Sequence, residues 1–374
     1  MTELGLYLHI PFCKSKCSYC DFYSLPHREQ EMDAYTAALC RELIGGAFRC
    51  DNAVVDTVYF GGGTPSYLGS ERLSQILATV KEHYRLLPTA EVTVEANPDS
   101  AGEVAPLAQL RQAGCNRISL GVQSTDDALL KRIGRIHTYA QVKQAVWAAR
   151  QAGFENLSID LIYGLPEQSL AQWQQTLQEA VELQAQHISV YGLKVEEGTP
   201  LWREKDTAGV AGDDLQADMY LWAVEFLRQQ GYGQYEISNF ARPGFESRHN
   251  LKYWQLKPYL GFGPGAHSDF GGERFARERD LERYISGTAG DSERTAISLQ
   301  ERQMEYIMLS LRTTRGLETE SLRQYGVDIG ALEPLMKQCQ SHDLAAQTQT
   351  GWRLTPKGFL VSNAIIGQAQ DAIG

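Results

Sequence analysis

Apolar residues recur over the first 200 residues in short runs that alternate with longer amphipathic stretches. The runs have the length of strands and lie at 4–9, 54–60, 91–96, 117–121, 157–163 and 187–193. Stretches with an apolar period of about 3.6 residues lie between them, at 33–48, 70–84, 104–113, 139–152 and 169–183. Strands and helices that alternate at intervals of ~30 residues predict parallel strands joined by right-handed crossovers. We therefore expect an α/β fold that begins with a partial barrel of six β/α units.

The repeating pattern stops near residue 211, which divides the chain into three expected parts. Residues 1–210 form the barrel, and residues 211–289, with a helix near 214–230, form an extension of it. Residues 290–374 show helices near 298–313, 318–325 and 329–338, a hairpin of 344–347 with 352–354, and a last helix from Pro356. This order is typical of a small winged-helix-like domain.

The charge of the chain argues against a nucleic-acid partner. The formal net charge is −11, and residues 291–374 carry eight Lys and Arg against ten Asp and Glu, a net charge of about −2. No basic stripe is available to replace phosphate counterions. No apolar run approaches ~18 residues and no signal segment precedes Leu4, so we expect a cytoplasmic protein.

Three closely spaced cysteines follow the first predicted strand. Cys13, Cys17 and Cys20 form a C-x3-C-x2-C run at the end of a strand where barrel active sites lie. Three thiolates can hold three irons of a [4Fe–4S] cluster and leave the fourth iron open. A zinc site would need a fourth ligand, and a disulfide scaffold would need a short, cysteine-rich secreted chain. Three unrelated buried cysteines are the remaining alternative.

Polar residues and glycines follow several other strands. Gly62, Gly63 and Thr64 come after the second strand, where the backbone could approach a small ligand, although a glycine run is often only a turn. Glu95 ends the third strand, and three further polar candidates are Gln123, Arg135 and Asp160. Each carboxylate alone could be a capping residue, but their recurrence at successive strands predicts one shared site.

The cysteine run resembles the signature of the radical S-adenosylmethionine (SAM) superfamily, including the aromatic Tyr19 before the last cysteine. The resemblance implies a [4Fe–4S] cluster whose open iron is chelated by the amino and carboxylate groups of SAM. An electron then enters the sulfonium and a 5′-deoxyadenosyl radical results. It also implies that Gly62, Gly63, Thr64 and Glu95 bind the amino group and that Arg135 binds the carboxylate. Gln123 and Asp160 would bind the ribose, and Tyr7, Tyr19 and Ile162 would flank the cluster and adenine.

Longer motifs narrow the resemblance to the group that contains oxygen-independent coproporphyrinogen III dehydrogenase and the HemW-type heme chaperones. The motifs are Y-L-H-I-P-F-C, Y-F-G-G-G-T-P-S, G-V-Q-S, I-D-L-I-Y-G-L-P and G-F-G-P-G-A-H-S. The dehydrogenase continues its cysteine run as C-x3-C-x2-C-x-C, whereas Phe22 stands at the last of these positions here. The chaperone branch carries H-N-x-x-Y-W, which residues 249–254 match in full.

This second motif indicates a place for heme. The imidazole of His249 could bind the iron, and Asn250, Tyr253 and Trp254 would complete the heme contact together with Phe22. A single histidine near aromatic residues is more often a hydrogen-bonded core residue, and His267 is a second candidate ligand in a glycine-rich segment that could be a tight turn.

We therefore expect a heme chaperone that holds a [4Fe–4S] cluster, SAM and heme and delivers heme to respiratory hemoproteins, with peripheral contact at the inner face of the membrane. A flavodoxin or ferredoxin would supply electrons. The alternative is an enzyme, an oxygen-independent coproporphyrinogen III dehydrogenase that decarboxylates porphyrinogen propionates. The sequence leaves the oligomeric state open.

Overall fold

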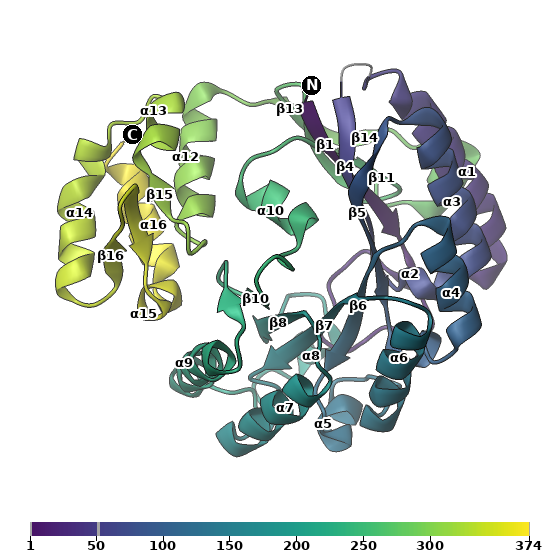
Figure 1. The fold of residues 1–374 in the computed structure, drawn as a ribbon, viewed down its shortest axis with the longest axis horizontal. Coiled ribbons are helices and arrows are strands. Elements are labelled where there is room, and N and C mark those ends of the chain that lie inside the picture. Colours follow the sequence, from purple (N-terminus) through teal and green to yellow (C-terminus); the bar gives the residue numbers. More distant parts are fainter. Residues whose placement is uncertain (1, 51–52, 374) are drawn as a thin grey trace.

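The computed structural model describes residues 2–50 and 53–373, and its main feature is one curved sheet of twelve strands (Figure 1). Its centre is the predicted barrel, in which six strands are parallel neighbours. These strands are β1 (Thr2–Ile10), β4 (Ala53–Gly62), β5 (Leu86–Ala96), β6 (Arg117–Gln123), β7 (Asn156–Tyr163) and β8 (His187–Gly192). The five main helices between them are α1 (Met32–Ala47), α3 (Ser70–His83), α4 (Val104–Ala113), α6 (Tyr139–Gln151) and α7 (Leu170–Glu182). The expected partial barrel is confirmed.

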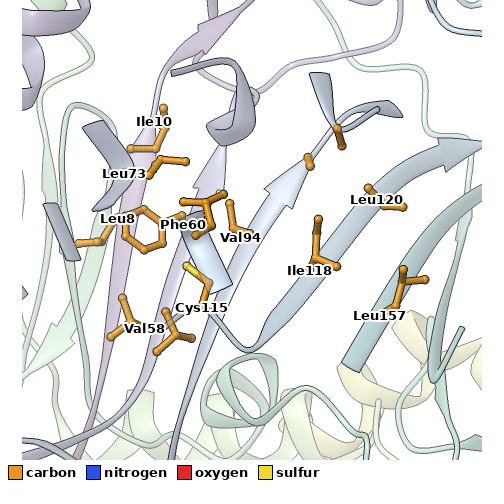
Figure 2. Close-up of a cluster of buried hydrophobic side chains, with 14 of the residues drawn as sticks. Leu8, Ile10, Val58, Phe60, Leu73, Val94, Cys115, Ile118, Leu120 and Leu157 are labelled. Atoms are coloured by element: carbon orange, nitrogen blue, oxygen red, sulfur yellow. The ribbon is translucent and has the colours of Figure 1, made fainter. Parts of the chain in front are cut away.

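Alternate residues of each barrel strand face the helices and form the main hydrophobic core. Leu8 and Ile10 of β1, Phe60 of β4 and Val94 of β5 are fully buried, and Figure 2 shows them together with Leu73 of α3. The residues between them in sequence face the inside of the sheet, because successive side chains of a strand point to opposite faces. Most of these inward residues are polar, unlike the apolar layers that usually fill such barrels.

Segments from residues 211–289 and β14 extend the sheet at both ends. At one end, β11 (Tyr259–Phe262) lies parallel to β1 and is followed by the antiparallel strands β12 (His267–Phe270), β13 (Glu273–Arg277) and β14 (Asp291–Ala296). At the other end, β10 (Asn239–Ala241) and β9 (Gly233–Gln234) follow β8. The helix expected near 214–230 is α9 (Asp213–Gln229).

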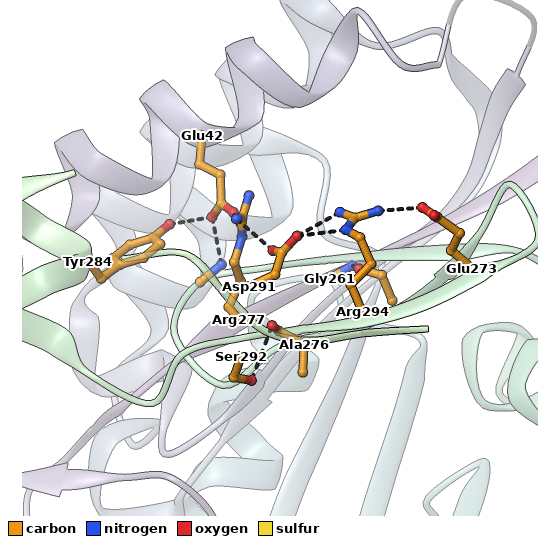
Figure 3. Close-up of polar contacts among 11 residues, drawn as sticks. Glu42, Gly261, Glu273, Ala276, Arg277, Tyr284, Asp291, Ser292 and Arg294 are labelled. Carbon is orange, nitrogen blue, oxygen red and sulfur yellow. Dashed lines mark hydrogen bonds and ion pairs between the residues drawn. The ribbon is translucent and has the colours of Figure 1, made fainter. Parts of the chain in front are cut away.

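Polar contacts attach the added strands to the barrel (Figure 3). Glu42 of α1 accepts hydrogen bonds from Arg277 Nε at 2.6 Å and from the Tyr284 hydroxyl at 2.6 Å. Arg277 also pairs with Asp291 at 2.9 Å, and Asp291 pairs with Arg294 at 2.6 Å. Glu42 of the barrel thus binds Arg277 and Tyr284 of the extension, and Asp291 links Arg277 to Arg294.

The C-terminal domain packs its own hydrophobic core and contains a three-stranded antiparallel sheet in the order β15-β17-β16. The hairpin of β16 (Ala345–Gln347) and β17 (Gly351–Leu354) was expected, whereas the short strand β15 (Leu317–Glu318) was not. The helices are α12 (Leu299–Ser310), α13 (Thr319–Gln324), α14 (Ile329–Ser341), α15 (Pro356–Leu360) and α16 (Ser362–Asp371).

The boundary expected at residue 290 falls inside the large sheet. The six residues of β14 pair with β13 and therefore belong to the barrel extension. We propose to place the domain boundary at residue 297, directly after this strand.

Shorter elements complete the described chain. They are β2 (Phe12–Cys13), β3 (Leu25–Pro26), α2 (Pro65–Leu68), α5 (Asp127–Arg132), α8 (Pro200–Arg203), α10 (Arg248–Trp254), α11 (Leu281–Ser286) and two 3-10 turns, Glu29–Glu31 and Pro98–Ser100.

Helix α10 lies inside the curve of the sheet, against β4, and carries the H-N-x-x-Y-W motif (Figure 1). Glu91 of β5 accepts hydrogen bonds from the backbone N–H groups of Arg248 and His249, at 3.2 and 3.1 Å. A carboxylate at this place offsets the unpaired N–H groups of a helix start. Lys252 pairs with Asp56 of β4 at 2.6 Å, and both side chains are almost completely buried. The motif therefore closes the inner face near the start of the strands.

We expect the Lys252–Asp56 pair to be important for stability. Replacing Lys252 by Met leaves the Asp56 carboxylate buried without its nearest cation, which should lower the free energy of unfolding by about 3–5 kcal/mol. Denaturant titration followed by circular dichroism measures the change. The matched control is Lys337→Met, which breaks the exposed pair with Glu333 and should cost only about 0.3–0.5 kcal/mol. Equal losses in the two variants would contradict the expectation.

Candidate functional site

The cysteine loop packs directly on the end of β4. Gly63 N donates to Ile10 O at 2.8 Å, and Thr64 N donates to Phe12 O at 2.7 Å. A Cβ atom on Gly63 would lie 2.7 Å from Phe12 O and 3.0 Å from the Cys13 sulfur, so no larger residue fits without displacing the loop. The glycine run thus has a steric reason at this position, beyond a simple turn.

One cavity of about 340 Å³ joins the cysteine loop to the ends of the barrel strands. Thirteen of the residues predicted to hold a cofactor line it. They are Cys13, Cys17, Tyr19, Cys20, Phe22, Gly62, Gly63, Thr64, Glu95, Gln123, Arg135, Asp160 and Ile162. These residues come from five strands and the loops after them, and the fold brings them to one end of the barrel.

The three cysteines fit a cluster with an open iron. All three cysteines line the same cavity, and no fourth cysteine or histidine is among its lining residues. Thr64 Oγ1 donates to the Cys13 sulfur and an Arg135 N–H donates to the Cys17 sulfur, both at 3.5 Å. In a [4Fe–4S] cluster held by three cysteines, each thiolate would bind a different iron.

Glu95 is held at the cavity wall by two donors. The Tyr59 hydroxyl donates to Oε1 at 2.7 Å, and Gly62 N donates to Oε2 at 3.2 Å. Burial raises the pKa of Glu95 to about 7, and the nearby Asp160 adds to the rise, although both hydrogen bonds oppose it. A carboxyl group with this pKa can accept a hydrogen bond from an amino group when it is ionised.

Asp160 is fixed by two serines on the neighbouring strands. Ser189 Oγ donates to it at 2.6 Å, and Ser119 Oγ lies 3.3 Å from its second oxygen. Gln123, the last residue of β6, has a φ angle of +66°, a conformation that non-glycine residues rarely adopt. Such strain is typical of residues that the surrounding structure holds for a function.

Arg135 makes three contacts across the cavity wall. Its NH2 group donates to Asn97 Oδ1 at 2.8 Å and to Gly121 O at 2.5 Å, while NH1 reaches Cys17. These contacts use three of the five N–H donors of the guanidinium, and Nε–H and the second N–H of NH1 are not part of them. Asn97 also donates to Thr64 at 3.0 Å and therefore connects both sides of the site.

Sequence reasoning missed Tyr59 and Asn97. Asn97 lies two residues after Glu95, so the period of two along a strand was the signal that could have identified it. Tyr59 lies three residues before Gly62 on the same strand, and this period does not relate the two.

Tyr7 lies deeper than the sequence predicted and is not among the residues that line the cavity. Its hydroxyl contacts His9 Nδ1 at 3.1 Å, and burial raises the pKa of Tyr7 above its ordinary value. A direct contact of Tyr7 with a ligand in this cavity is therefore not part of the observed geometry.

The imidazole of His249 is enclosed by protein. Only 1% of its surface is exposed, Nδ1 lies 2.8 Å from Thr57 Oγ1, and Nε2 lies 2.8 Å from the Tyr253 hydroxyl. Burial lowers the pKa of His249 to about 3, with Lys252 as a second cause, so the ring is neutral. The arrangement is that of a hydrogen-bonded core histidine, and neither ring nitrogen is free to bind iron in this conformation.

The motif nevertheless contacts the predicted SAM site through one aromatic ring. The His249 ring stacks on Tyr59 with centroids 5.1 Å apart and an interplanar angle of 24°, and Tyr59 is the residue that donates to Glu95. Asn250, Tyr253 and Trp254 are half-buried on the same helix.

Comparison with known proteins identifies the family. The radical SAM superfamily matches residues 7–180, and the HemN C-terminal domain matches residues 297–361. Heme chaperone HemW of Bacillus subtilis (strain 168) is 35% identical over 96% of this chain and 97% of its own, and heme chaperone HemW of Escherichia coli (strain K12) is 32% identical over 98% of each. This chain belongs to the HemW branch of the radical SAM superfamily.

A solved structure extends the likeness to the fold of the whole chain. Coproporphyrinogen III oxidase (HemN) from Escherichia coli, described as a radical SAM enzyme, superposes with a TM-score of 0.85 and covers 99% of this chain and 90% of its own, at 23% identity. This chain therefore shares the HemN fold. Membership in the radical SAM superfamily implies a [4Fe–4S] cluster and SAM as cofactors.

We expect anaerobically reconstituted protein to hold one [4Fe–4S] cluster, as the three cysteines of this HemW-branch chain imply. Cys13→Ala, Cys17→Ala and Cys20→Ala should each abolish it, because each removes the ligand of one iron. Iron and sulfide analysis and electron paramagnetic resonance measure the cluster, and added SAM should change the resonance. Cys40→Ala is the matched control and should retain the cluster, because the Cys40 sulfur accepts a hydrogen bond from Thr79 and does not line the cavity. Four irons and four sulfides in a triple Cys13, Cys17 and Cys20 variant would refute the assignment.

The pKa of Glu95 predicts a pH dependence of stability without SAM. The ordinary pKa of this carboxyl group is 4.5, so between pH 4.5 and about pH 7 the folded protein keeps a proton on Glu95 that the unfolded chain releases. Glu95 therefore makes the free energy of unfolding fall as the pH rises through this range. Glu95→Gln removes this titration. Its stability relative to the natural chain should therefore increase between pH 5 and pH 8, as measured by thermal unfolding at both values. A difference that does not depend on pH would contradict the raised pKa.

Proposed function

We propose that this protein is a heme chaperone that binds a [4Fe–4S] cluster, SAM and heme and delivers heme to respiratory hemoproteins. The observation that carries the proposal is Phe22. Its side chain is 64% exposed and borders the cavity beside Cys20, at the position where the dehydrogenase pattern continues with a further cysteine. The two HemW relatives, each matched over nearly its whole length, support the same conclusion.

The residues around the cavity have distinct proposed roles. Cys13, Cys17 and Cys20 hold the cluster, and Gly62, Gly63, Thr64 and Glu95 bind the amino group of SAM. Arg135 binds its carboxylate, Gln123 and Asp160 bind the ribose, and Tyr19 and Ile162 cover the adenine side. When bound, the cluster would supply the electron that enters the SAM sulfonium.

Within this site, side chains of the protein orient the ligand, and Glu95 can hold or release one proton. The two serines on Asp160 leave its carboxylate fixed for ribose hydroxyls. The hydroxyl of Tyr59 and the backbone N–H of Gly62 both donate to Glu95 and keep its carboxylate at the strand end. Ionised Glu95 accepts a hydrogen bond from an amino group, whereas protonated Glu95 can donate one.

The H-N-x-x-Y-W helix offers aromatic rings to heme. Tyr253 and Trp254 are half-buried and can contribute ring surface to a porphyrin, with Asn250 beside them. Iron ligation by His249 would require α10 to move, since both ring nitrogens are already engaged. We therefore propose the aromatic residues, more than His249, as heme contacts of this helix.

The proposed partners follow from the function. Recipient hemoproteins take the heme, and a flavodoxin or ferredoxin supplies electrons to the cluster. We propose a cytoplasmic location with peripheral contact at the inner face of the membrane. None of the helices in the described part of the chain has the length and apolar character needed to cross a membrane.

A second candidate function is the oxygen-independent coproporphyrinogen III dehydrogenase. The observation in its favour is the cavity, which keeps every predicted SAM residue except Tyr7 on its wall. A protein that only carried heme would have little evident need for all of them.

A paired experiment distinguishes the two functions. We expect the natural protein, reconstituted with its cluster, to bind hemin saturably at one equivalent and to convert no coproporphyrinogen III under anaerobic reducing conditions with SAM. Absorption titration measures the first property, and chromatography of the porphyrins measures the second. Multiple turnovers without saturable hemin binding would refute the chaperone and favour the dehydrogenase.

A further inference from the structure

A protein that gives electrons to the cluster must come close to the cysteine loop, because electron transfer slows steeply with distance. The loop faces the cavity of about 340 Å³ that is proposed to hold SAM, and a shallow hollow of about 10 Å³ lies beside this cavity. Of the three cluster cysteines, all in the described part of the chain, Cys17 alone lines both spaces. The hollow is therefore a side on which a donor can come near Cys17 without displacing SAM.

The cover over Cys17 at this hollow is thin. Gly134, two residues after α5, is exposed and has a φ of +76°, a conformation that favours glycine. A Cβ atom on Gly134 would lie 3.3 Å from Ser18 N and 3.7 Å from the Cα of Cys17. Ser18 N also donates to Ile133 O at 3.1 Å, which fixes this segment against the loop. A single glycine thus separates the backbone of Cys17 from solvent at this point.

An apolar side chain lies next to this glycine. Ile136 lines the hollow and is 48% exposed. Protein interfaces commonly have an apolar centre surrounded by a polar rim, and encounters between electron-transfer proteins use small contact areas. The exposed Ile136 beside Gly134 therefore offers a centre of suitable size for a short-lived redox contact.

The surroundings of this centre are basic. Lys14 lines the hollow, and Lys131 lies on α5, where its carbonyl accepts a hydrogen bond from Gly134 N at 3.1 Å. Both lysines are exposed, and neither forms an ion pair with the part of the chain that the structure describes. Helix α8 borders the loop on another side, where Leu201 N donates to Ser18 O at 2.9 Å.

The charge around the loop is opposite in sign to that of the chain. The bordering segments 14–21, 131–137 and 200–206 together carry seven Lys and Arg against three Asp and Glu, whereas the whole chain carries 35 against 46. Three acidic groups near the loop interact with groups of the protein itself. They are Glu29 with Tyr67, Asp99 with Arg135 and Glu204 with Arg132. Asp21 and Asp206 are exposed, and they leave the bordering segments with a positive excess.

We propose that the surface formed by Lys14, Lys131, Gly134 and Ile136 is the docking site of a small acidic electron-carrier protein of the flavodoxin or ferredoxin class. The inference rests on the proposed function and names the place where its electron donor binds. One electron passes from the reduced cofactor of the carrier to the cluster, so the carrier is oxidised and the cluster is reduced from the 2+ to the 1+ state. Complementary charges speed such an encounter, and the small contact lets the carrier leave.

The test measures how fast reduced flavodoxin, and separately reduced ferredoxin, reduces the cluster of the full-length, reconstituted protein. Absorption under anaerobic conditions follows the reaction. Lys14→Glu combined with Lys131→Glu should slow it roughly tenfold or more at low ionic strength, because like charges repel the carrier. The difference should shrink at high salt, which screens exposed charges. Ile136→Ser keeps every charge and should slow the reaction at both ionic strengths.

The matched control is Lys257→Glu combined with Lys357→Glu, which changes the net charge by the same amount. Both of these lysines are exposed. Lys257 precedes β11 at the opposite end of the barrel strands from the cysteine loop, and Lys357 lies in the C-terminal domain. The control should keep the natural rate. Photoreduced 5-deazariboflavin, a small uncharged reductant, should reduce the cluster equally fast in all of these proteins, because it needs no docking surface.

Each outcome decides a different question. An unchanged rate in the Lys14 and Lys131 variant, or an equal loss in the control, would overturn the inference. A slower reaction with 5-deazariboflavin would also overturn it, since the cluster itself would then have changed. Normal reduction with slower heme transfer to an apocytochrome would assign this surface to a recipient hemoprotein instead. If neither carrier reduces the natural protein while 5-deazariboflavin does, the proposed electron donor and this inference are both wrong, whereas the hemin titration tests the chaperone separately.

Discussion

The close packing of the cysteine loop on the glycine-rich end of β4 is the constraint on which the site depends. A Cβ atom on Gly63 would clash with the Phe12 carbonyl oxygen. Gly62 has a φ of +114°, and a Cβ atom there would lie 2.6 Å from the His9 ring. The His9 ring is itself fixed by Tyr23 O at 2.8 Å. Because glycine alone fits both positions, the loop can place Cys13 at the cavity, and the N–H groups of Gly63 and Thr64 hold it there through Ile10 O and Phe12 O.

The polar inner face of the barrel imposes a second requirement, because buried polar groups must find partners. Arg117 is 1% exposed, and the charges of Glu91 and Asp160 act on it. Helix α10 meets part of this requirement by supplying N–H groups to Glu91 and an ammonium group to Asp56. The motif that resembles a heme-binding segment thus also has a structural role, and its contact with Tyr59 joins the helix to the predicted SAM site.

The sequence predicted the parts of the fold that follow from local periodicity. All six barrel strands and their five helices appear within a few residues of their expected positions, since apolar residues alternate strongly there. Strands β11 and β12 were not predicted, because Gly261 and the residues after it suggest a loop. Gly261 is in fact required inside the hairpin, where a Cβ would lie 2.2 Å from His267 O. The strand β14 was missed because five of its six residues are exposed and carry no apolar pattern.

The candidate site also has a part that the sequence could predict and a part that it could not. Its cavity residues follow from a motif and from strand ends, so their convergence was predictable. The hydrogen bond of His249 to Thr57 was not predictable, because Thr57 lies 192 residues away in the chain. The same limit applies to Arg135, whose contacts with Asn97 and Cys17 span 38 and 118 residues. Such pairings depend on which strands become neighbours, and no local pattern encodes them.

The likeness to HemN shows why single positions matter more than the architecture for the choice of function. The two chains share one fold over nearly their whole length at 23% identity, and a fold by itself does not determine the chemistry. Phe22 changes the cavity rim from a thiol position to an exposed aromatic ring, which cannot ligate metal or exchange protons. An exposed phenylalanine of this kind offers apolar surface to a flat ligand or to a partner protein. We propose that the rim of the cavity is altered toward binding, while its interior is lined by the residues predicted to hold SAM.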